Sequence, residues 1–165
     1  MKISKLIVIM LLVALSGYFA QSKSTSTKPK TAKKVEETTQ HVPPPQPPKD
    51  GVLIHISSGT ENPQKVLMGL TMGLKMADDR DVFIFMDIDA VNVVLISSKS
   101  LELPKFESSK ILIDKILNKG IKIAVCTMCL EAINKTQYDL MKGIKFVNKD
   151  DFFDFTQGRI LTLNY

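Results

Sequence analysis

The sequence predicts an α/β fold, in which a parallel β-sheet has helices on both faces. Between Gly51 and Tyr165, strand-like apolar runs alternate with helix-like segments five times, which is typical of parallel sheets. The run at residues 81–86 is almost continuously apolar, as expected for a strand covered on both faces. A chain of 165 residues with 44% hydrophobic side chains can build one core but not two.

Capping and turn residues divide residues 51–165 into elements. A strand at 52–56 leads through a polar loop to a helix that begins at Pro63, with Asn62 as its N-cap. A second helix begins at Ser108 and stops at Gly120. The remaining elements, in order, are the strand at 81–86, a short helix near 91–96, a strand at 121–125, a short helix near 130–134, a short apolar run at 144–147, a helix at 150–156 and a strand at 159–163.

The first 50 residues have a different character. Lys2 and Lys5 precede an apolar run at residues 6–15, which predicts a secretory signal peptide at residues 1–20. An uncleaved N-terminal membrane anchor is the alternative, although the run is shorter than the ~20 residues of a spanning helix. Residues 21–50 are rich in Lys, Ser, Thr and Pro and predict a disordered linker. We therefore expect an exported, periplasmic protein that is membrane-tethered only if its leader remains.

The net charge of +5 does not indicate a nucleic-acid partner. The first 50 residues contain eight lysines and three acidic residues, whereas residues 51–165 contain 14 basic and 14 acidic residues. The excess positive charge therefore belongs to the leader and linker, and we expect no basic face on the folded part.

Both cysteines of the chain lie together at the end of a predicted strand. The alternating run at 121–125 ends at Cys126, and Cys129 follows three residues later, where a helix-like segment begins. The carboxyl ends of parallel strands form the usual site of an open α/β fold, and helix-start N–H groups favour an anion there. A thiolate or persulfide anion at Cys126 is therefore our prediction for the catalytic chemistry, with Cys129 as a second thiol.

The loop after the first strand is predicted to face the same crevice. Its residues offer hydroxyl and N–H donors, and Gly59 allows a close approach of backbone or ligand. The candidate substrate-binding residues are therefore Ser57, Ser58, Gly59, Thr60 and Asn62, together with Thr127 and Met128 between the cysteines. His55 lies within a strand and is expected to be a satisfied core or face residue. Asp87 and Asp89 are expected to be caps and solvated turn residues.

Other chemistries of a C-x-x-C pair fit less well. Two cysteines and one histidine in the domain do not complete a zinc site, so we expect no metal. A thioredoxin-type site usually has an aromatic residue before its first cysteine and a later facing proline, whereas here Val125 precedes Cys126 and no proline follows Pro104. A thiol-disulfide oxidoreductase nevertheless remains an alternative. So does a non-catalytic binding or assembly module with a structural disulfide.

Residues 51–165 resemble the DsrE/DsrF-like sulfur-relay proteins (the DsrE family). Four features in the same order support the resemblance. They are the strand and loop from Ile54 to Pro63, the apolar second strand, the segment from Lys119 to Leu130 with its two cysteines, and the hydrophobic strand near 159–161. The resemblance implies a three-layer α/β/α sandwich with a five-stranded, mainly parallel sheet, and a homo-oligomer, either a trimer or a hexamer.

The resemblance also implies roles for the cysteines. Cys126 matches the residue that accepts sulfane sulfur as a persulfide and passes it on, and Cys129 matches a second cysteine of many single-domain members. We therefore expect an exported carrier of sulfane sulfur, a candidate sulfurtransferase. Its partner would be a sulfur-donor or acceptor protein, or a small thiol or polysulfide. Thiolate exchange of this kind needs no cofactor.

Overall fold

The structure is a computed structural model that describes residues 46–165. The predicted leader and most of the predicted linker, residues 1–45, lie outside the described residues. Along the chain the elements are β1 (Gly51–Ile56), α1 (Pro63–Met76), β2 (Asp81–Met86), the 3₁₀ helix η1 (Ile88–Val94), α2 (Ser109–Asn118), β3 (Lys122–Val125), α3 (Thr127–Ala132), the 3₁₀ helix η2 (Gln137–Asp139), β4 (Lys145–Phe146), α4 (Asp151–Asp154) and β5 (Ile160–Asn164).

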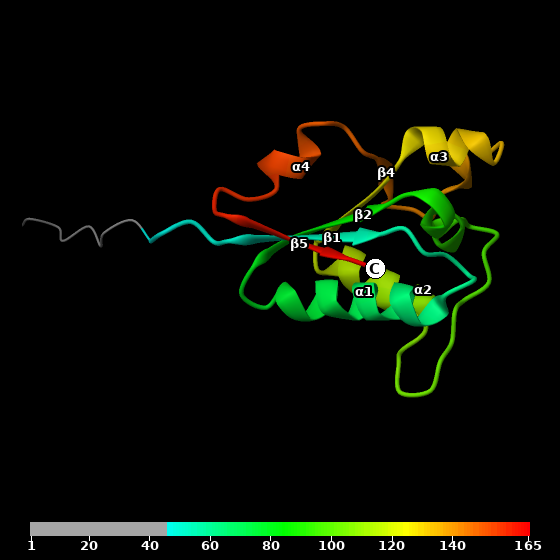
Figure 1. The fold of residues 1–165 in the computed structure, drawn as a ribbon, viewed down its shortest axis with the longest axis horizontal. Coiled ribbons are helices and arrows are strands. Elements are labelled where there is room, and N and C mark those ends of the chain that lie inside the picture. The colour runs from blue at the N-terminus through cyan, green and yellow to red at the C-terminus, as the bar shows by residue number, and fades with distance from the viewer. Residues whose placement is uncertain (1–45) are drawn as a thin grey trace, which may run out of the picture. The chain divides into compact units, whose positions relative to one another are not determined.

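The five strands form one sheet in the order β4-β3-β2-β1-β5, and every neighbouring pair is parallel. Helices α1 and α2 lie on one face of this sheet, and α3 and α4 lie on the other (Figure 1). The predicted α/β/α sandwich with a five-stranded parallel sheet is therefore confirmed. β1, β2 and β3 occupy the middle of the sheet, so their carboxyl ends lie side by side.

The main core lies between the sheet and α1 and α2. Val66, Leu67 and Leu70 of α1 are fully buried, as are Ile54 and Ile84 of the facing strands. Burial of each such side chain stabilises the fold by about 1.5–3 kcal/mol. This core fixes how β1 and β2 are placed relative to each other.

The opposite face of the sheet has an aromatic core. Phe152 of α4 packs edge-on against Phe83 and Phe85 of β2, with ring centroids 5.6 Å and 5.1 Å apart. Phe155 lies 5.7 Å from Phe83. These contacts hold the short helix α4 over the middle of the sheet.

Three helix boundaries differ from the sequence prediction. The helix expected near 91–96 is a 3₁₀ helix that begins earlier, at Ile88. The helix expected near 130–134 begins at Thr127, because the Cys126 side chain caps it. The helix expected to reach residue 156 ends at Asp154, and the hydroxyl of Thr156 donates a hydrogen bond to the Lys49 carbonyl at 2.7 Å instead of continuing the helix.

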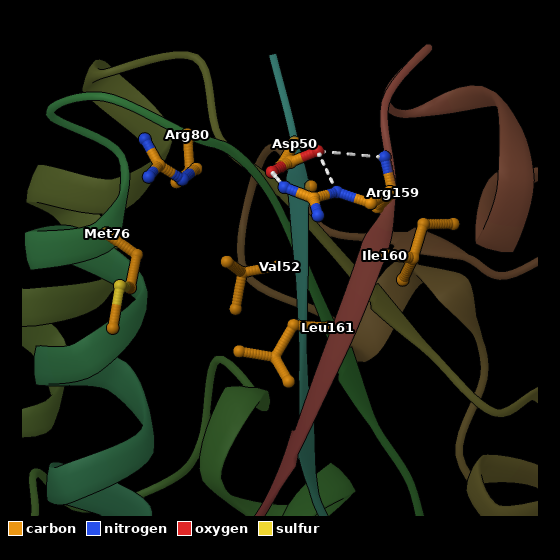
Figure 2. Close-up of a pocket in the computed structure, with 8 residues that line it drawn as sticks. Asp50, Val52, Met76, Arg80, Arg159, Ile160 and Leu161 are labelled. Carbon is orange, nitrogen blue, oxygen red and sulfur yellow. Dashed lines mark hydrogen bonds and ion pairs between the residues drawn. The ribbon is translucent and has the colours of Figure 1, made fainter.

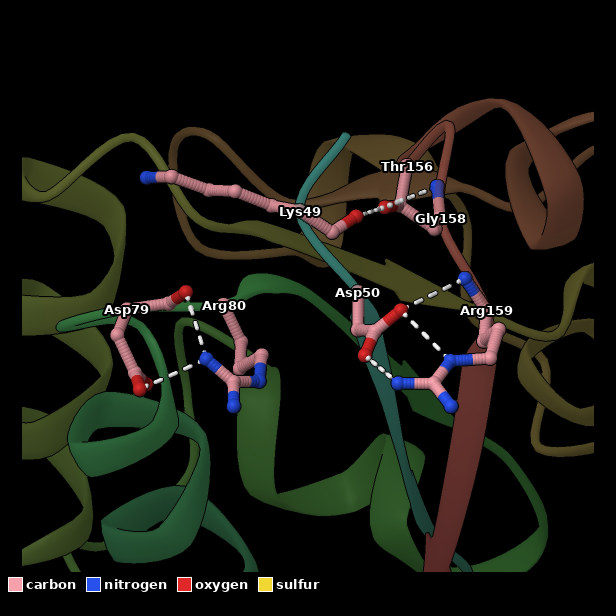
Figure 3. A network of polar contacts seen from close by, with 7 residues as sticks. All are labelled: Lys49, Asp50, Asp79, Arg80, Thr156, Gly158 and Arg159. Carbon is pink, nitrogen blue, oxygen red and sulfur yellow. Dashed lines mark hydrogen bonds and ion pairs between the residues drawn. The ribbon is translucent and has the colours of Figure 1, made fainter. Parts of the chain in front are cut away.

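At the amino end of the sheet, an ion pair ties the start of β1 to the start of β5. The Arg159 guanidinium donates from Nε and Nη2 to the two carboxylate oxygens of Asp50, at 3.1 Å and 2.6 Å (Figure 2). The Arg159 N–H also donates to this carboxylate, at 3.0 Å. Figure 3 shows the same pair next to the contact between Lys49 and Thr156. These contacts anchor the first described residues to the last strand.

Candidate functional site

The carboxyl edge of the sheet brings together residues from three strands. Register pairs Ile56 with Met86 and Met86 with Val125, so Ser57, Asp87 and Cys126 follow directly at neighbouring strand ends. The backbone hydrogen bonds continue here, because Asp87 N–H donates to Ile56 O at 3.2 Å and Cys126 N–H donates to Met86 O at 3.0 Å. The structure thus sets Cys126 at the edge where open parallel sheets hold their sites.

Cys126 is the N-cap residue of α3. Its sulfur accepts the backbone N–H of Cys129, with a donor–acceptor distance of 3.4 Å. Both cysteines are half-buried and free, not joined in a disulfide. The two thiols therefore lie in one partly exposed site, and an N–H group is already directed at the Cys126 sulfur.

Cys129 holds its proton more tightly than an ordinary cysteine does. Burial raises the pKa of its thiol above 9.0, and the contact with Cys126 and the nearby charge of Asp87 raise it further. A backbone hydrogen bond from Ile88 acts in the opposite direction. At neutral pH Cys129 is therefore a neutral thiol, which must lose a proton before it attacks a sulfur atom.

Ile88, the residue after Asp87, has an unusual backbone conformation. Its φ is +46°, in the left-handed region that a β-branched residue rarely adopts. Such conformations cost about 1–3 kcal/mol and are found mainly at functional sites. Here the left-handed residue starts η1 directly after β2, and its side chain is 59% exposed.

Three of the predicted loop residues have structural partners of their own. Ser57 donates from its hydroxyl and its N–H to the carbonyl of Tyr165, at 3.4 Å and 3.0 Å. The Gly59 N–H donates to the Glu61 carboxylate at 2.8 Å and 2.9 Å. Asn62 caps α1, as predicted, by accepting the Lys65 N–H at 3.3 Å. These groups shape the loop, which follows β1 at the same edge of the sheet as Cys126.

The other candidate binding residues stay predictions. Ser58 and Thr127 are half-buried, and Thr60 is exposed. Met128 has 77% of its side chain exposed between the two cysteines. Thr127 and Met128 form the first turn of α3, so they are the candidates nearest to the thiols in the chain.

His55 and Asp87 form a polar pair that the sequence analysis did not assign to the site. The His55 Nε2 lies 3.0 Å from the Asp87 Oδ2, and the His55 Nδ1 lies 3.0 Å from the Asn164 Oδ1. The imidazole stacks on Phe85, with centroids 5.4 Å apart. Asp87 is the N-cap residue of η1, as predicted, although its side chain makes no capping hydrogen bond. The sequence places His55 within the strand at 52–56 and Asp87 directly after the strand at 81–86, but it does not indicate that these two side chains meet.

Within residues 46–165, no three histidine, cysteine or acidic side chains are grouped to hold a metal ion. In the same range, none of the helices has the length and apolar character needed to cross a membrane. The predicted leader lies outside this range.

The cavity in Figure 2 lies at the other end of β1 from the cysteines. It has a volume of about 460 Å³ and is lined by Asp50, Val52, Met76, Arg80 and Leu161, among others. Because Asp50 precedes β1 and Ser57 follows it, the length of the strand separates this cavity from the thiol site.

Comparisons with known proteins identify the fold. No family model matches the sequence, and no curated protein matches it either. The structure is similar to the crystal structure of the YchN protein from E. coli, with a TM-score of 0.57, 13% identity, and coverage of 70% of this chain and 99% of that one. It is also similar to MTH1491 from Methanobacterium thermoautotrophicum, a protein of unknown function, with a TM-score of 0.51, 17% identity and the same coverage. The described domain therefore has the fold of these two proteins.

Proposed function

We propose that this protein carries sulfane sulfur as a persulfide on Cys126, with Cys129 as the second thiol. The observation that carries the proposal is the arrangement of the two free thiols at the sheet edge, where the Cys126 sulfur accepts the Cys129 N–H. An N–H donor at this sulfur stabilises an anion on it. The resemblance of residues 51–165 to the DsrE/DsrF-like relay proteins, and the fold shared with YchN, support the same chemistry.

In this proposal the Cys126 thiolate attacks the outer sulfur of a persulfide or polysulfide donor. The donor's S–S bond breaks, its thiol leaves, and the sulfane sulfur stays on Cys126. Cys129 or an acceptor thiol then takes that outer sulfur. The donor and acceptor are proteins or small thiols, and the reaction uses no metal or organic cofactor.

The proposal includes the cellular setting that the sequence predicts. Residues 1–20 direct export to the periplasm, residues 21–50 are a tether, and the domain assembles as a homo-oligomer. The exposed apolar side chains of α4 and β5 support self-association, since Phe153, Ile160 and Leu161 are 70%, 40% and 56% exposed in the single chain.

The test is transfer of sulfane sulfur from the protein to glutathione after loading with polysulfide. Cys126→Ser is expected to lose loading and transfer, because serine cannot form a persulfide. Cys129→Ser is the matched control, and it is expected to load sulfur but to transfer it more slowly. Full loading and transfer by Cys126→Ser would contradict the proposal.

A second candidate function is thiol-disulfide exchange by the same pair. The contact between the Cys126 sulfur and the Cys129 N–H favours it, because it holds both free thiols in one site. In that case the oxidised pair would turn over a disulfide substrate, and each single Cys→Ser variant would lose turnover equally.

A further inference from the structure

The two edges of the sheet differ in how well they are protected against pairing with another strand. β4 is an edge strand of two residues and begins with Lys145, and short, charged edge strands resist such pairing. β5, at the opposite edge, has five residues, Ile160–Asn164, and none of them is charged. Within residues 46–165, no strand pairs with its outer side. β5 is therefore the edge at which a further strand can be added.

The backbone groups of β5 alternate between β1 and the open edge. The Arg159 carbonyl accepts the Gly51 N–H at 2.7 Å, and the Tyr165 N–H donates to the His55 carbonyl at 2.9 Å, so residues 159 and 165 face β1. Successive residues of a strand direct their backbone groups to opposite sides, so the residues at even positions between these two face outward. They are Ile160, Thr162 and Asn164. Their N–H and C=O groups form a row of donors and acceptors along the edge of the sheet.

This row is complementary to itself. In an antiparallel pair, two facing residues that lie directly opposite each other exchange both of their hydrogen bonds. When a two-fold axis passes beside Thr162, this residue lies opposite its own copy, and Ile160 lies opposite Asn164 of the second copy. Among the residues of β5, only this register pairs all of the outward-facing ones. A second β5 strand can therefore satisfy the whole row.

The side chains of β5 also suit a second copy. In the same register Leu161 lies opposite Leu163 of the second copy, and cross-strand apolar pairs of this kind stabilise sheets. Leu161 and Ile160 are 56% and 40% exposed, and both line the cavity in Figure 2. They project from opposite faces of the sheet, so an added strand covers apolar surface on both faces. The nearest charge, on Arg159, is paired with Asp50, so the contact does not bring unpaired like charges together.

We propose that two copies of this chain pair through β5, antiparallel and centred on Thr162, so that their two sheets become one continuous sheet. This inference rests on the self-association proposed above and identifies the contact that produces it. A two-fold contact joins copies in pairs, so of the trimer and the hexamer it fits the hexamer. The occupant of the edge is a second copy because the strand is uncharged and its row of backbone groups is complementary to itself.

Disulfide crosslinking of the full chain tests both the contact and its register. The background is Cys126→Ser with Cys129→Ser, which removes both native thiols, and a serine at position 126 can still cap α3. In this background Thr162→Cys is expected to form a covalent dimer under mild oxidation. The reason is that residues of a hydrogen-bonded antiparallel pair have Cα atoms about 5.5 Å apart, a distance that a disulfide spans.

Leu161→Cys in the same background is the matched control, since this neighbouring residue is also exposed. In the proposed register its two copies are diagonal neighbours about 7–8 Å apart, which is too far for a disulfide. It is therefore expected to form little covalent dimer alone. A mixture of Leu161→Cys and Leu163→Cys chains is expected to crosslink between the two variants, because these positions lie opposite each other.

The second measurement removes one backbone donor from the edge. Thr162→Pro deletes an N–H that faces outward and takes no part in the pairing with β1, so circular dichroism is expected to show a folded protein. Sedimentation velocity is expected to show the loss of the paired species in this variant. Thr162→Ala keeps the N–H and is the control, which is expected to sediment like wild type.

The proposal would be overturned if Thr162→Cys formed no covalent dimer, if Leu161→Cys alone formed one as readily, or if Thr162→Pro sedimented like wild type. Oligomers that persist without a crosslink at position 162 would place the self-association elsewhere, for example on the exposed Phe153 of α4. The crosslinking background contains no native thiol, so these results do not depend on sulfur carriage. That function fails separately, if Cys126→Ser still accepts sulfur.

Discussion

Gly59 determines how the loop after β1 packs at the thiol edge. A β-carbon at this position would lie 2.4 Å from the backbone oxygen of Asp89, and a backbone atom cannot rotate away as a side chain can. The sequence analysis predicted that Gly59 allows a close approach. The partner in the structure is the η1 backbone.

Gly59→Ala is expected to destabilise the protein by about 1–3 kcal/mol, because the loop or η1 must shift to remove the clash. Chemical denaturation of the full chain measures the change, and Ser58→Ala in the same loop is the control. Because η1 follows β2 at the edge of the sheet where Cys126 lies, the substitution is also expected to slow sulfur uptake. Wild-type stability in Gly59→Ala would contradict the close packing of this loop against the η1 backbone.

At the residue scale, the sequence predicted Cys126, Cys129 and the Asn62 cap, because each follows from local spacing. It did not predict the contact between His55 and Asp87. Their contact depends on parallel register across β1 and β2 and on the partner Asn164 of β5, more than 100 residues away in the chain. A single sequence does not specify that register.

At the element scale, the ion pair between Asp50 and Arg159 joins the amino ends of β1 and β5. Hydrogen bonds from Arg159 lower the pKa of Asp50 to about 2 from its usual 3.8. Since the folded-state pKa is the lower one, this pair contributes its full stabilisation above pH 3.8. The contribution is lost as the pH falls toward 2.

Arg159→Met is expected to reduce the loss of folding stability that acidification causes. Between pH 4 and pH 2 the wild-type free energy of unfolding should fall more steeply than that of the variant, and the two curves should converge at the acidic end. Denaturant unfolding followed by circular dichroism at several pH values measures both. Parallel curves over this interval would mean that the ion pair does not act in solution.

Most elements could be predicted from the sequence because their signals are local. Pro63 and Gly120 mark a helix start and a helix stop, and Gly120 has the left-handed φ of +79° that such a stop requires. The starts of α3 and η1 were predicted less well. Each of these helices begins after a strand end whose position is set by hydrogen bonds to the neighbouring strand. The Cys126 N–H, for example, donates to the Met86 carbonyl.

At the scale of the whole molecule, the neutral charge of residues 51–165 and the exposed apolar residues of α4 and β5 favour self-association. β5 is an edge strand of the sheet and contains no charged residue between Ile160 and Asn164, so it lacks a common protection against pairing with another strand.

Sedimentation velocity is expected to show a trimer or hexamer of the 18.4 kDa chain. Leu161→Lys places a charge on the exposed edge strand and is expected to shift the population toward the monomer. Lys142→Glu, an exposed change away from β5, is the control. A wild-type protein that sediments as a monomer at micromolar concentration would contradict the proposed assembly.

The central claim is that Cys126 holds sulfane sulfur, and intact mass spectrometry of the exported protein tests it most directly. After polysulfide treatment, wild type should be heavier by one sulfur atom, lose that mass on reduction, and show the modification on Cys126 in peptide mapping. Cys126→Ser should gain nothing. A wild-type protein that instead loses only two hydrogen atoms and takes up no sulfur would contradict the claim and indicate a disulfide between Cys126 and Cys129.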